Sequence, residues 1–116
     1  MRMWIGVSPS EMCRKHLLGE HVELHMMVGS IRKGKSLAGF FRNRLIFPES
    51  IEARHDLISE EMINRGYQHR SVLPDYDYSN LSYPWPSRKD FKSNRIELAT
   101  RCADCLIKMF LKGQEV

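Results

Sequence analysis

The sequence is short of several signals that would define a protein class. Its three cysteines are few and odd in number, which is typical of a reduced compartment and not of a disulfide framework. It lacks an apolar run near the roughly 18 residues of a membrane helix, a signal peptide and a lipidation motif. It also lacks a P-loop, a dinucleotide fingerprint and a G-x-S-x-G motif. We therefore expect a cytoplasmic protein without a membrane segment, a nucleotide cofactor or a serine nucleophile.

Acidic residues are missing from one stretch of the chain. The totals are only mildly basic, with 18 Lys and Arg against 14 Asp and Glu. Between Glu23 and Glu49, however, every charged side chain is basic, and the cationic residues there are Arg32, Lys33, Lys35, Arg42 and Arg44. Such a block suits a phosphate-binding surface, although a solvated helix face also carries charge runs.

Hydrophobic periodicity predicts a mainly α fold. At 116 residues the chain is large enough for one domain, over 1–116, with a single core. Apolar residues at helical spacing predict helices over 8–32, 48–65 and 87–113. The expected capping residues are Ser8 with Glu11, Gly66, and Ser87 with Asp90. The segments 35–47 and 67–86 lack such a pattern, so we expect a compact single-domain three-helix arrangement with long irregular loops.

A polar column follows one side of the first predicted helix. His16, Glu20 and Glu23 are spaced i, i+4 and i+7 and project the same way. They border an apolar stripe that includes Leu17 and Leu24, so we expect them at the edge of the core. Carboxylates there often have shifted pKa values and perform acid–base chemistry. An ordinary amphipathic helix shows the same arrangement.

Two groups of residues raise the question of metal binding. His21 and His25 lie one helical turn apart, and Cys102 and Cys105 form a C-x-x-C pair. The histidine spacing matches no metalloprotease motif, and one C-x-x-C pair cannot complete a tetrahedral zinc site. We therefore expect exposed or hydrogen-bonded histidines, packed cysteines, and neither a metal nor another cofactor.

Aromatic residues gather in the last irregular segment, at Tyr76, Tyr78, Tyr83 and Trp85. Together with the basic block and the carboxylates, they suit an enzyme that acts on a base within DNA. Such an enzyme needs cations for phosphates, side chains that stack where a nucleotide is extruded, and an acid–base group at the sugar. The aromatics could equally pack a long loop onto a small core.

The sequence also resembles the pyrimidine-dimer DNA glycosylase family. The resemblance is carried by His16-Leu17 with Glu20, by Glu23-Leu24, and by the run Gly29-x-Ile31-Arg32-Lys33-Gly34-Lys35; Arg65-Gly66-Tyr67 adds to it. It extends from Met1 to about Arg70 and leaves the aromatic segment uncovered. It implies a monomeric, nucleoid-associated DNA repair enzyme that acts on double-stranded DNA carrying a damaged base.

In that family the α-amine of the chain attacks C1′ of the damaged nucleotide and forms a Schiff base, a glutamate at the position of Glu23 is essential, and β-elimination cuts the strand. An α-amine suits this step because its pKa, about 8 against about 10.4 for lysine, leaves roughly a tenth of it unprotonated at neutral pH. Because the large Arg2 ordinarily blocks removal of the initiator, we expect Met1 to carry the amine. The predicted catalytic residues are Met1, Glu23 and His16, and the predicted DNA contacts are Arg2, Glu20, Arg32, Lys33, Lys35, Arg42 and Arg44.

Val22 and Met26 mark a departure from the family pattern. They align with two arginines with which a phage member contacts DNA. The substrate could thus be another lesion or an abasic site. The alternative function is a non-catalytic DNA-binding or protein-interaction module on the same scaffold, with Val22 and Met26 as its partner surface.

Overall fold

The structure is a computed structural model that describes residues 1–69 and 71–114. The α-helices are α1 (Arg14–Arg32), α2 (Ala38–Arg42), α3 (Ile51–Asn64), α4 (Arg88–Arg101) and α5 (Ala103–Gly113). Two 3₁₀ turns, η1 (Pro9–Glu11) and η2 (Pro48–Ser50), precede α1 and α3. No β-strand occurs in these two described ranges. The prediction of a mainly α fold is therefore confirmed.

The first and third predicted helices are interrupted, and in the second the α-helix begins only at Ile51, after η2. The capping box of Ser8 and Glu11 is present, with the Ser8 amide donating to Glu11 Oε1 over 3.1 Å, but it caps only η1. Cys13 has an extended backbone and becomes the N-cap of α1. The last predicted helix breaks at Cys102, whose φ of −132° and ψ of 110° end α4. α2 lies in the segment expected to be irregular, so the fold has five α-helices in its described part and not three.

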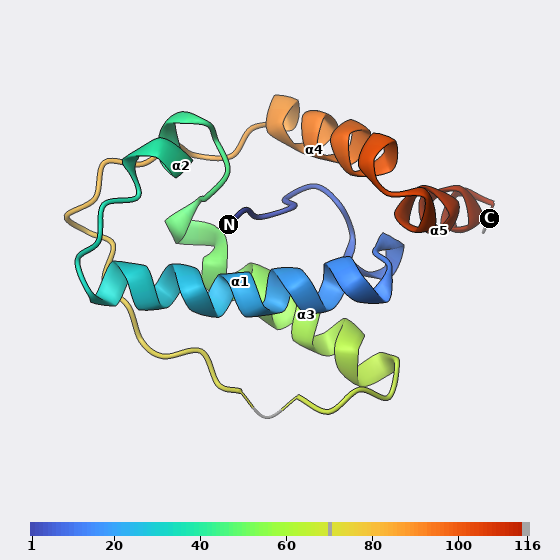
Figure 1. The fold of residues 1–116 in the computed structure, drawn as a ribbon, viewed down its shortest axis with the longest axis horizontal. Coiled ribbons are helices and arrows are strands. Elements are labelled where there is room, and N and C mark those ends of the chain that lie inside the picture. Colours follow the sequence, from blue (N-terminus) through green and yellow to red (C-terminus); the bar gives the residue numbers. More distant parts are fainter. Residues whose placement is uncertain (70, 115–116) are drawn as a thin grey trace.

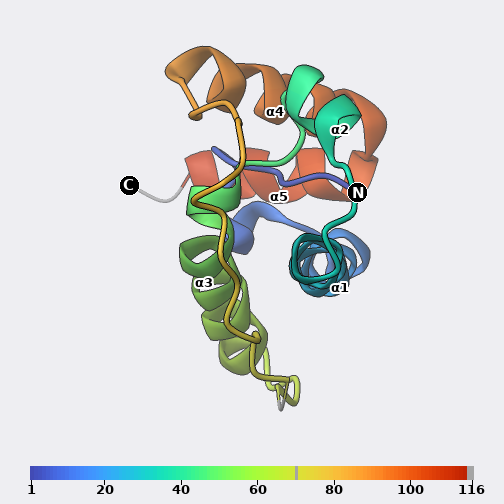
Figure 2. The same cartoon turned by 90° about the vertical axis from the view of Figure 1, so that its left-hand side faces the viewer.

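The helices form two layers with the N-terminal segment between them (Figures 1 and 2). α1 packs on α3 in one layer, and α4 leads into α5 in the other. The segment passes close beneath α4 at Gly6, where φ is +96° and an added Cβ would lie 2.5 Å from the Phe91 Cα. Only glycine fits there, because both the backbone conformation and the space exclude a side chain.

The core lies between these layers. Leu17 and Leu24 of the predicted apolar stripe on α1 are fully buried, in one core cluster with Val28, Phe47 and Ile58. α3 ends as expected at Gly66, which has a φ of +82°, and the Tyr67 amide donates back to the Met62 carbonyl over 2.9 Å. The stripe thus fixes the face of α1 that is buried and leaves the Glu23 face at the core edge.

Candidate functional site

The N-terminal amine lies beside a carboxylate of α1. The Met1 nitrogen is 3.6 Å from Glu23 Oε1, and the side chains of Met1 and Glu23 are 12% and 33% exposed. The polar column predicted from sequence thus places Glu23 at the edge of the core. An amine and a carboxylate at this separation, partly open to solvent, can act together on one bound group.

Four contacts hold the N-terminal segment in this position. The Met3 amide donates to the Leu45 carbonyl over 2.8 Å, and the Trp4 amide donates to Glu20 Oε2 over 3.2 Å. The Arg2 guanidinium donates to Asn94 Oδ1 over 2.9 Å and pairs with a carboxylate of α4. The segment is therefore tied on one side to α1 and on the other to α4.

Glu20 is buried, which corrects its predicted role as a DNA contact. Its side chain is fully enclosed, and its two oxygens accept from Arg54 Nε and Nη2 over 2.7 and 2.9 Å. Arg54 also donates to the Val7 carbonyl over 2.7 Å. With no surface open to a ligand, Glu20 instead anchors the backbone at Trp4. The buried Arg54 that pairs with it was missed by the sequence analysis, because a single arginine on an amphipathic helix carries no signal of its partner.

Arg2 is also drawn into the fold. Its guanidinium lies 3.7 Å from the centre of the Trp4 ring, and its side chain is only 14% exposed. Burial lowers the pKa of Arg2, against the opposing effect of Glu97. This placement makes Arg2 a structural link between the N-terminal segment and α4, in contrast to the DNA contact predicted for it.

The basic block divides into exposed and paired residues. Lys33, Lys35 and Arg42 are exposed around the end of α1 and on α2. Arg32 donates to a loop carbonyl over 2.6 Å. Arg44 forms a bidentate salt bridge with a carboxylate of α4, with hydrogen bonds of 2.7 and 2.8 Å. The exposed cations are therefore the stronger candidates for phosphate contacts.

The carboxylate that pairs with Arg44 is Asp90. The hydrogen bonds from Arg44 lower the pKa of Asp90 to about 2, against the effect of its burial. Asp90 also accepts from the Ser87 amide over 2.8 Å, which confirms the predicted capping box at the start of α4. Arg44 thus fastens the segment after α2 to the first turn of α4.

The aromatic residues of the last irregular segment form a continuous stack. Ring centres of Tyr76 and Tyr78, of Tyr78 and Tyr83, and of Tyr83 and Trp85 are 5.6, 5.6 and 6.1 Å apart. Tyr76 anchors one end, since its hydroxyl donates to the Pro48 carbonyl over 2.9 Å, and burial raises its pKa to about 12. Trp85 at the other end is 66% exposed. The stack therefore combines loop packing at one end with an exposed ring at the other.

Four histidines meet between α1, α3 and the loop after α3. Nε2 atoms of His21 and His69 are 2.8 Å apart, and those of His25 and His55 are 3.2 Å apart. His21 and His25 thus lie within hydrogen-bonding distance of other histidines, and the expectation that they bind no metal remains a prediction. The partners His55 and His69 were not predicted, because they are distant in sequence. The ligand atoms of His21, His55 and His69 all lie within 4.8 Å of one another, so these three could hold a metal ion.

The histidine cluster predicts a loss of stability in mild acid. Burial, followed by the neighbouring histidines, lowers the pKa of His21 from 6.5 to about 4, and burial also lowers the pKa values of His25 and His55, with Asp56 opposing it at His55. The neutral rings are therefore favoured in the folded state. Their contribution is complete above about pH 6.5 and is lost as the pH falls toward 4.

We expect urea unfolding midpoints to fall between pH 7 and pH 5, and to fall less in His21→Gln, which cannot be protonated at that position. Equal pH dependence in the two proteins would contradict the assignment to His21.

His16 begins the polar column, and its recorded side-chain contacts are with Cys13, Cys105 and Trp4. Its Nδ1 lies 3.2 Å from Cys13 Sγ, and its ring meets the Trp4 ring edge-on with centres 6.3 Å apart. Burial, followed by the cations Lys15 and Arg101, lowers the pKa of His16. Its predicted catalytic role remains a prediction, and its contacts are those of a cysteine cluster.

A terminal amine next to a helix carboxylate, on a helical domain that also carries exposed cations and a series of contacting aromatic rings, suits a small enzyme that acts on nucleic acid. The family model described as pyrimidine dimer DNA glycosylase matches residues 1–75. The match covers most of the chain and includes Met1, Glu23 and α1 to α3. The chain belongs to this family of DNA repair glycosylases. Neither a curated protein nor a solved structure matches it significantly.

The family match confirms the resemblance seen in the sequence, while the roles of individual residues remain to be proposed. The matched residues end before α4 and α5, although Arg2 and Arg44, which lie inside the match, contact α4.

In the part of the chain that the structure describes, no helix has the length and apolar character needed to cross a membrane.

Proposed function

We propose that this protein removes a damaged base from double-stranded DNA and cuts the strand at the resulting abasic site, as a monomer. The observation that carries the proposal is the distance of 3.6 Å between the Met1 nitrogen and Glu23 Oε1. Membership of the glycosylase family supplies the substrate class, a DNA that contains pyrimidine dimers or a related lesion.

The proposed reaction begins at the sugar. The unprotonated α-amine of Met1 forms a bond to C1′ as the bond from C1′ to the base breaks, and the electron pair of that bond leaves with the base, which takes up a proton. The negative charge of Glu23 stabilises the cationic character that develops on the sugar. The sugar ring then opens and leaves a protonated Schiff base between the amine and C1′.

Strand cleavage follows from the Schiff base. The iminium group acidifies the C2′ hydrogen, and Glu23 accepts this proton as a general base. The electron pair forms a double bond between C2′ and C3′, and the 3′ phosphate leaves with the C3′–O bond. Hydrolysis of the imine releases the product and restores the amine.

The chain terminus provides the direct test of this mechanism. Adding one residue before Met1, or acetylating its amine, should abolish both base removal and the covalent complex that borohydride traps on abasic-site DNA. The circular dichroism spectrum should be unchanged, because the hydrogen bonds of Met3 and Trp4 that hold the segment do not involve the amine. Peptide mapping of the trapped complex should place the adduct on Met1. An adduct on Lys33 or Lys35 would instead indicate a lysine Schiff base.

The exposed cations give a second prediction, on DNA affinity. If Lys33, Lys35 and Arg42 contact phosphates, replacing any one by glutamine should reduce the slope of log K against log salt by about 0.9. Lys108→Gln on α5, at the far end of the molecule from α2 (Figure 1), is the matched control. Unchanged slopes in all three variants would exclude this surface as the DNA-binding face.

A second candidate function rests on the exposed face of α1. Val22 and Met26 are 57% and 52% exposed and flank the position of Glu23. They favour a protein-interaction module that keeps the scaffold without catalysis. Borohydride trapping separates the two functions, since a non-catalytic module forms no covalent complex with abasic DNA.

Val22 and Met26 also bear on the substrate of the proposed glycosylase. Apolar side chains cannot pair with phosphates, so these two residues favour a lesion other than the one that a phage member of the family binds through arginines at these positions.

A further inference from the structure

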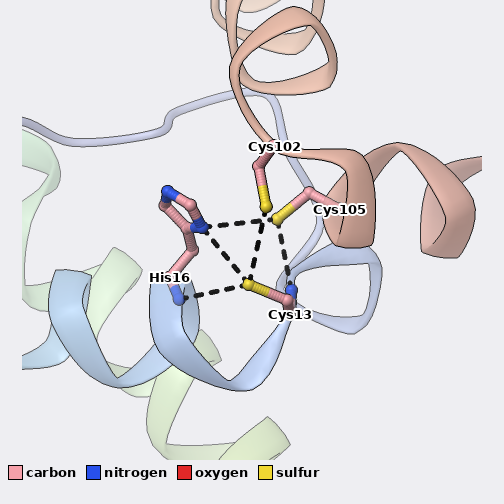
Figure 3. A group of neighbouring side chains, drawn as sticks. All are labelled: Cys13, His16, Cys102 and Cys105. Carbon is pink, nitrogen blue, oxygen red and sulfur yellow. Dashed lines mark hydrogen bonds between the residues drawn. The ribbon is translucent and has the colours of Figure 1, made fainter.

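A second cluster of reactive side chains lies at the start of α1, apart from the four-histidine cluster at the middle of that helix. Cys13 and His16 come from the first turn of α1, and Cys102 and Cys105 come from the junction of α4 and α5 (Figure 3). Their ligand atoms all lie within 4.8 Å of one another. The cluster brings together every cysteine of the chain, although 89 residues separate Cys13 from Cys102.

The spacing of these atoms fits a single tetrahedral ion. With Zn–S near 2.3 Å and Zn–N near 2.0–2.1 Å, a tetrahedral zinc site separates two sulfurs by about 3.8 Å and a sulfur from a nitrogen by about 3.5 Å. Here Cys13 Sγ and Cys102 Sγ are 3.9 Å apart. His16 Nδ1 lies 3.2 Å from Cys13 Sγ and 3.7 Å from Cys105 Sγ. The geometry points to a structural zinc site formed by Cys13, His16, Cys102 and Cys105.

The surroundings of the sulfurs support thiolate ligands. The Cys13 amide donates to Cys105 Sγ over 3.3 Å, and the His16 amide donates to Cys13 Sγ over 3.4 Å. Such N–H to sulfur bonds orient and stabilise metal-bound thiolates. Cys102 is the N-cap of α5, where the helix dipole favours negative charge. Three thiolates and one Zn²⁺ carry a net charge of −1. The cations Lys15 and Arg101 lie near His16 and would offset this negative charge.

Two other fates of the cysteines fit the structure less well. All three are free thiols, and the sulfur separation of 3.9 Å is well beyond the roughly 2.05 Å of a disulfide. An iron–sulfur cluster holds its ligands on two or more irons, which spreads the ligand atoms further than this compact arrangement allows. A mononuclear site is the one that matches the distances.

The position of α5 indicates what the ion does. Among the residues of α5, only Cys105 is buried. The large apolar residues Leu106, Ile107, Phe110 and Leu111 are each about half exposed or more. The zinc site would tie α5 and the end of α4 to the start of α1, next to Trp4 and the N-terminal segment. It lies partly outside the family match, which ends before Cys102, and so the glycosylase family does not imply it.

The test measures zinc and sulfur coordination in the full chain. Purified without chelator, the protein should contain one tightly held zinc that the double variant Cys102→Ser, Cys105→Ser loses. His21→Asn, which changes the separate histidine cluster, should retain it. Cobalt(II) added to the metal-free chain should give the strong visible absorption of a tetrahedral site and the near-ultraviolet thiolate bands. This measurement uses the unmodified chain, so it does not depend on the folding of any variant.

His16 can be tested separately as a ligand, because a fourth cysteine can take its place on the metal. His16→Cys changes the site to four cysteines, and we expect it to retain one zinc per chain and to show stronger cobalt–thiolate bands. Removal of the metal should increase hydrogen exchange in 103–113 more than in the middle of α1. Absence of zinc and of cobalt–thiolate bands would overturn the proposal, as would bound iron or a disulfide in the isolated protein.

Discussion

Glu23→Gln should lose catalysis while it retains DNA binding. The substitution keeps the size of the side chain but removes the charge that lies 3.6 Å from the Met1 nitrogen. The amide can neither stabilise a cationic sugar nor accept the C2′ proton. We expect the single-turnover rate of strand cleavage at a lesion to fall by about 10²–10⁴, and the dissociation constant for the same DNA to stay near its original value.

The matched control for this variant is Glu60→Gln, an exposed glutamate on α3. It has the same loss of charge without a place in the site, and its rate should remain unchanged. Near-normal turnover in Glu23→Gln would show that the carboxylate is assigned wrongly. A loss in Glu20→Gln is expected for a different reason, because that residue supports Trp4 and the fold.

Among the single variants considered, Arg54→Met should cause the largest loss in the free energy of unfolding. It leaves the enclosed Glu20 carboxylate without the guanidinium that donates to both its oxygens. Breaking a buried pair by removing one partner costs about 3–5 kcal/mol. This is a large share of the about 5–15 kcal/mol that holds a typical domain folded. Urea unfolding of the variant should show the loss, and Lys108→Met on the exposed side of α5 should show almost none.

A double variant separates the pair from the rest of the core. Glu20→Leu together with Arg54→Met removes both charges, so the loss should be smaller than the sum of the two single losses. It should not vanish, since the Trp4 amide and the Val7 carbonyl lose their partners. Strictly additive losses would mean that the two side chains do not interact in solution.

The parts of the fold that sequence could predict are those with local causes. The periodic apolar residues of α1 and the capping residues Ser87 and Gly66 act within a few positions of themselves, so they located helices correctly. The interruptions at Cys13 and Cys102 have a different origin. Both residues adopt an extended backbone at the point where their side chains meet, and that meeting joins distant segments.

The candidate site divides in the same way. Helical spacing placed His16, Glu20 and Glu23 on one face, and the resemblance to the glycosylase family singled out Glu23 among them. Glu20 shares that face, yet its role depends on Arg54, which lies 34 residues later. The four-histidine cluster and the cysteine cluster likewise unite residues from separate elements. A single sequence shows which side chains share a face, and only tertiary structure shows what meets that face.

The contacts of Arg2 also bear on when the site can form during synthesis. Arg2 reaches Asn94 and Glu97 on α4, so the residue next to the proposed nucleophile is held by a helix that is synthesised after α1, α2 and α3. Until that helix emerges, the N-terminal segment has only its ties to α1 and to Leu45. A nascent chain that already contains Glu23 and all of the matched family residues would therefore lack a fixed amine. Under the proposed mechanism, cleavage activity should arise only after α4 has emerged and has bound Arg2.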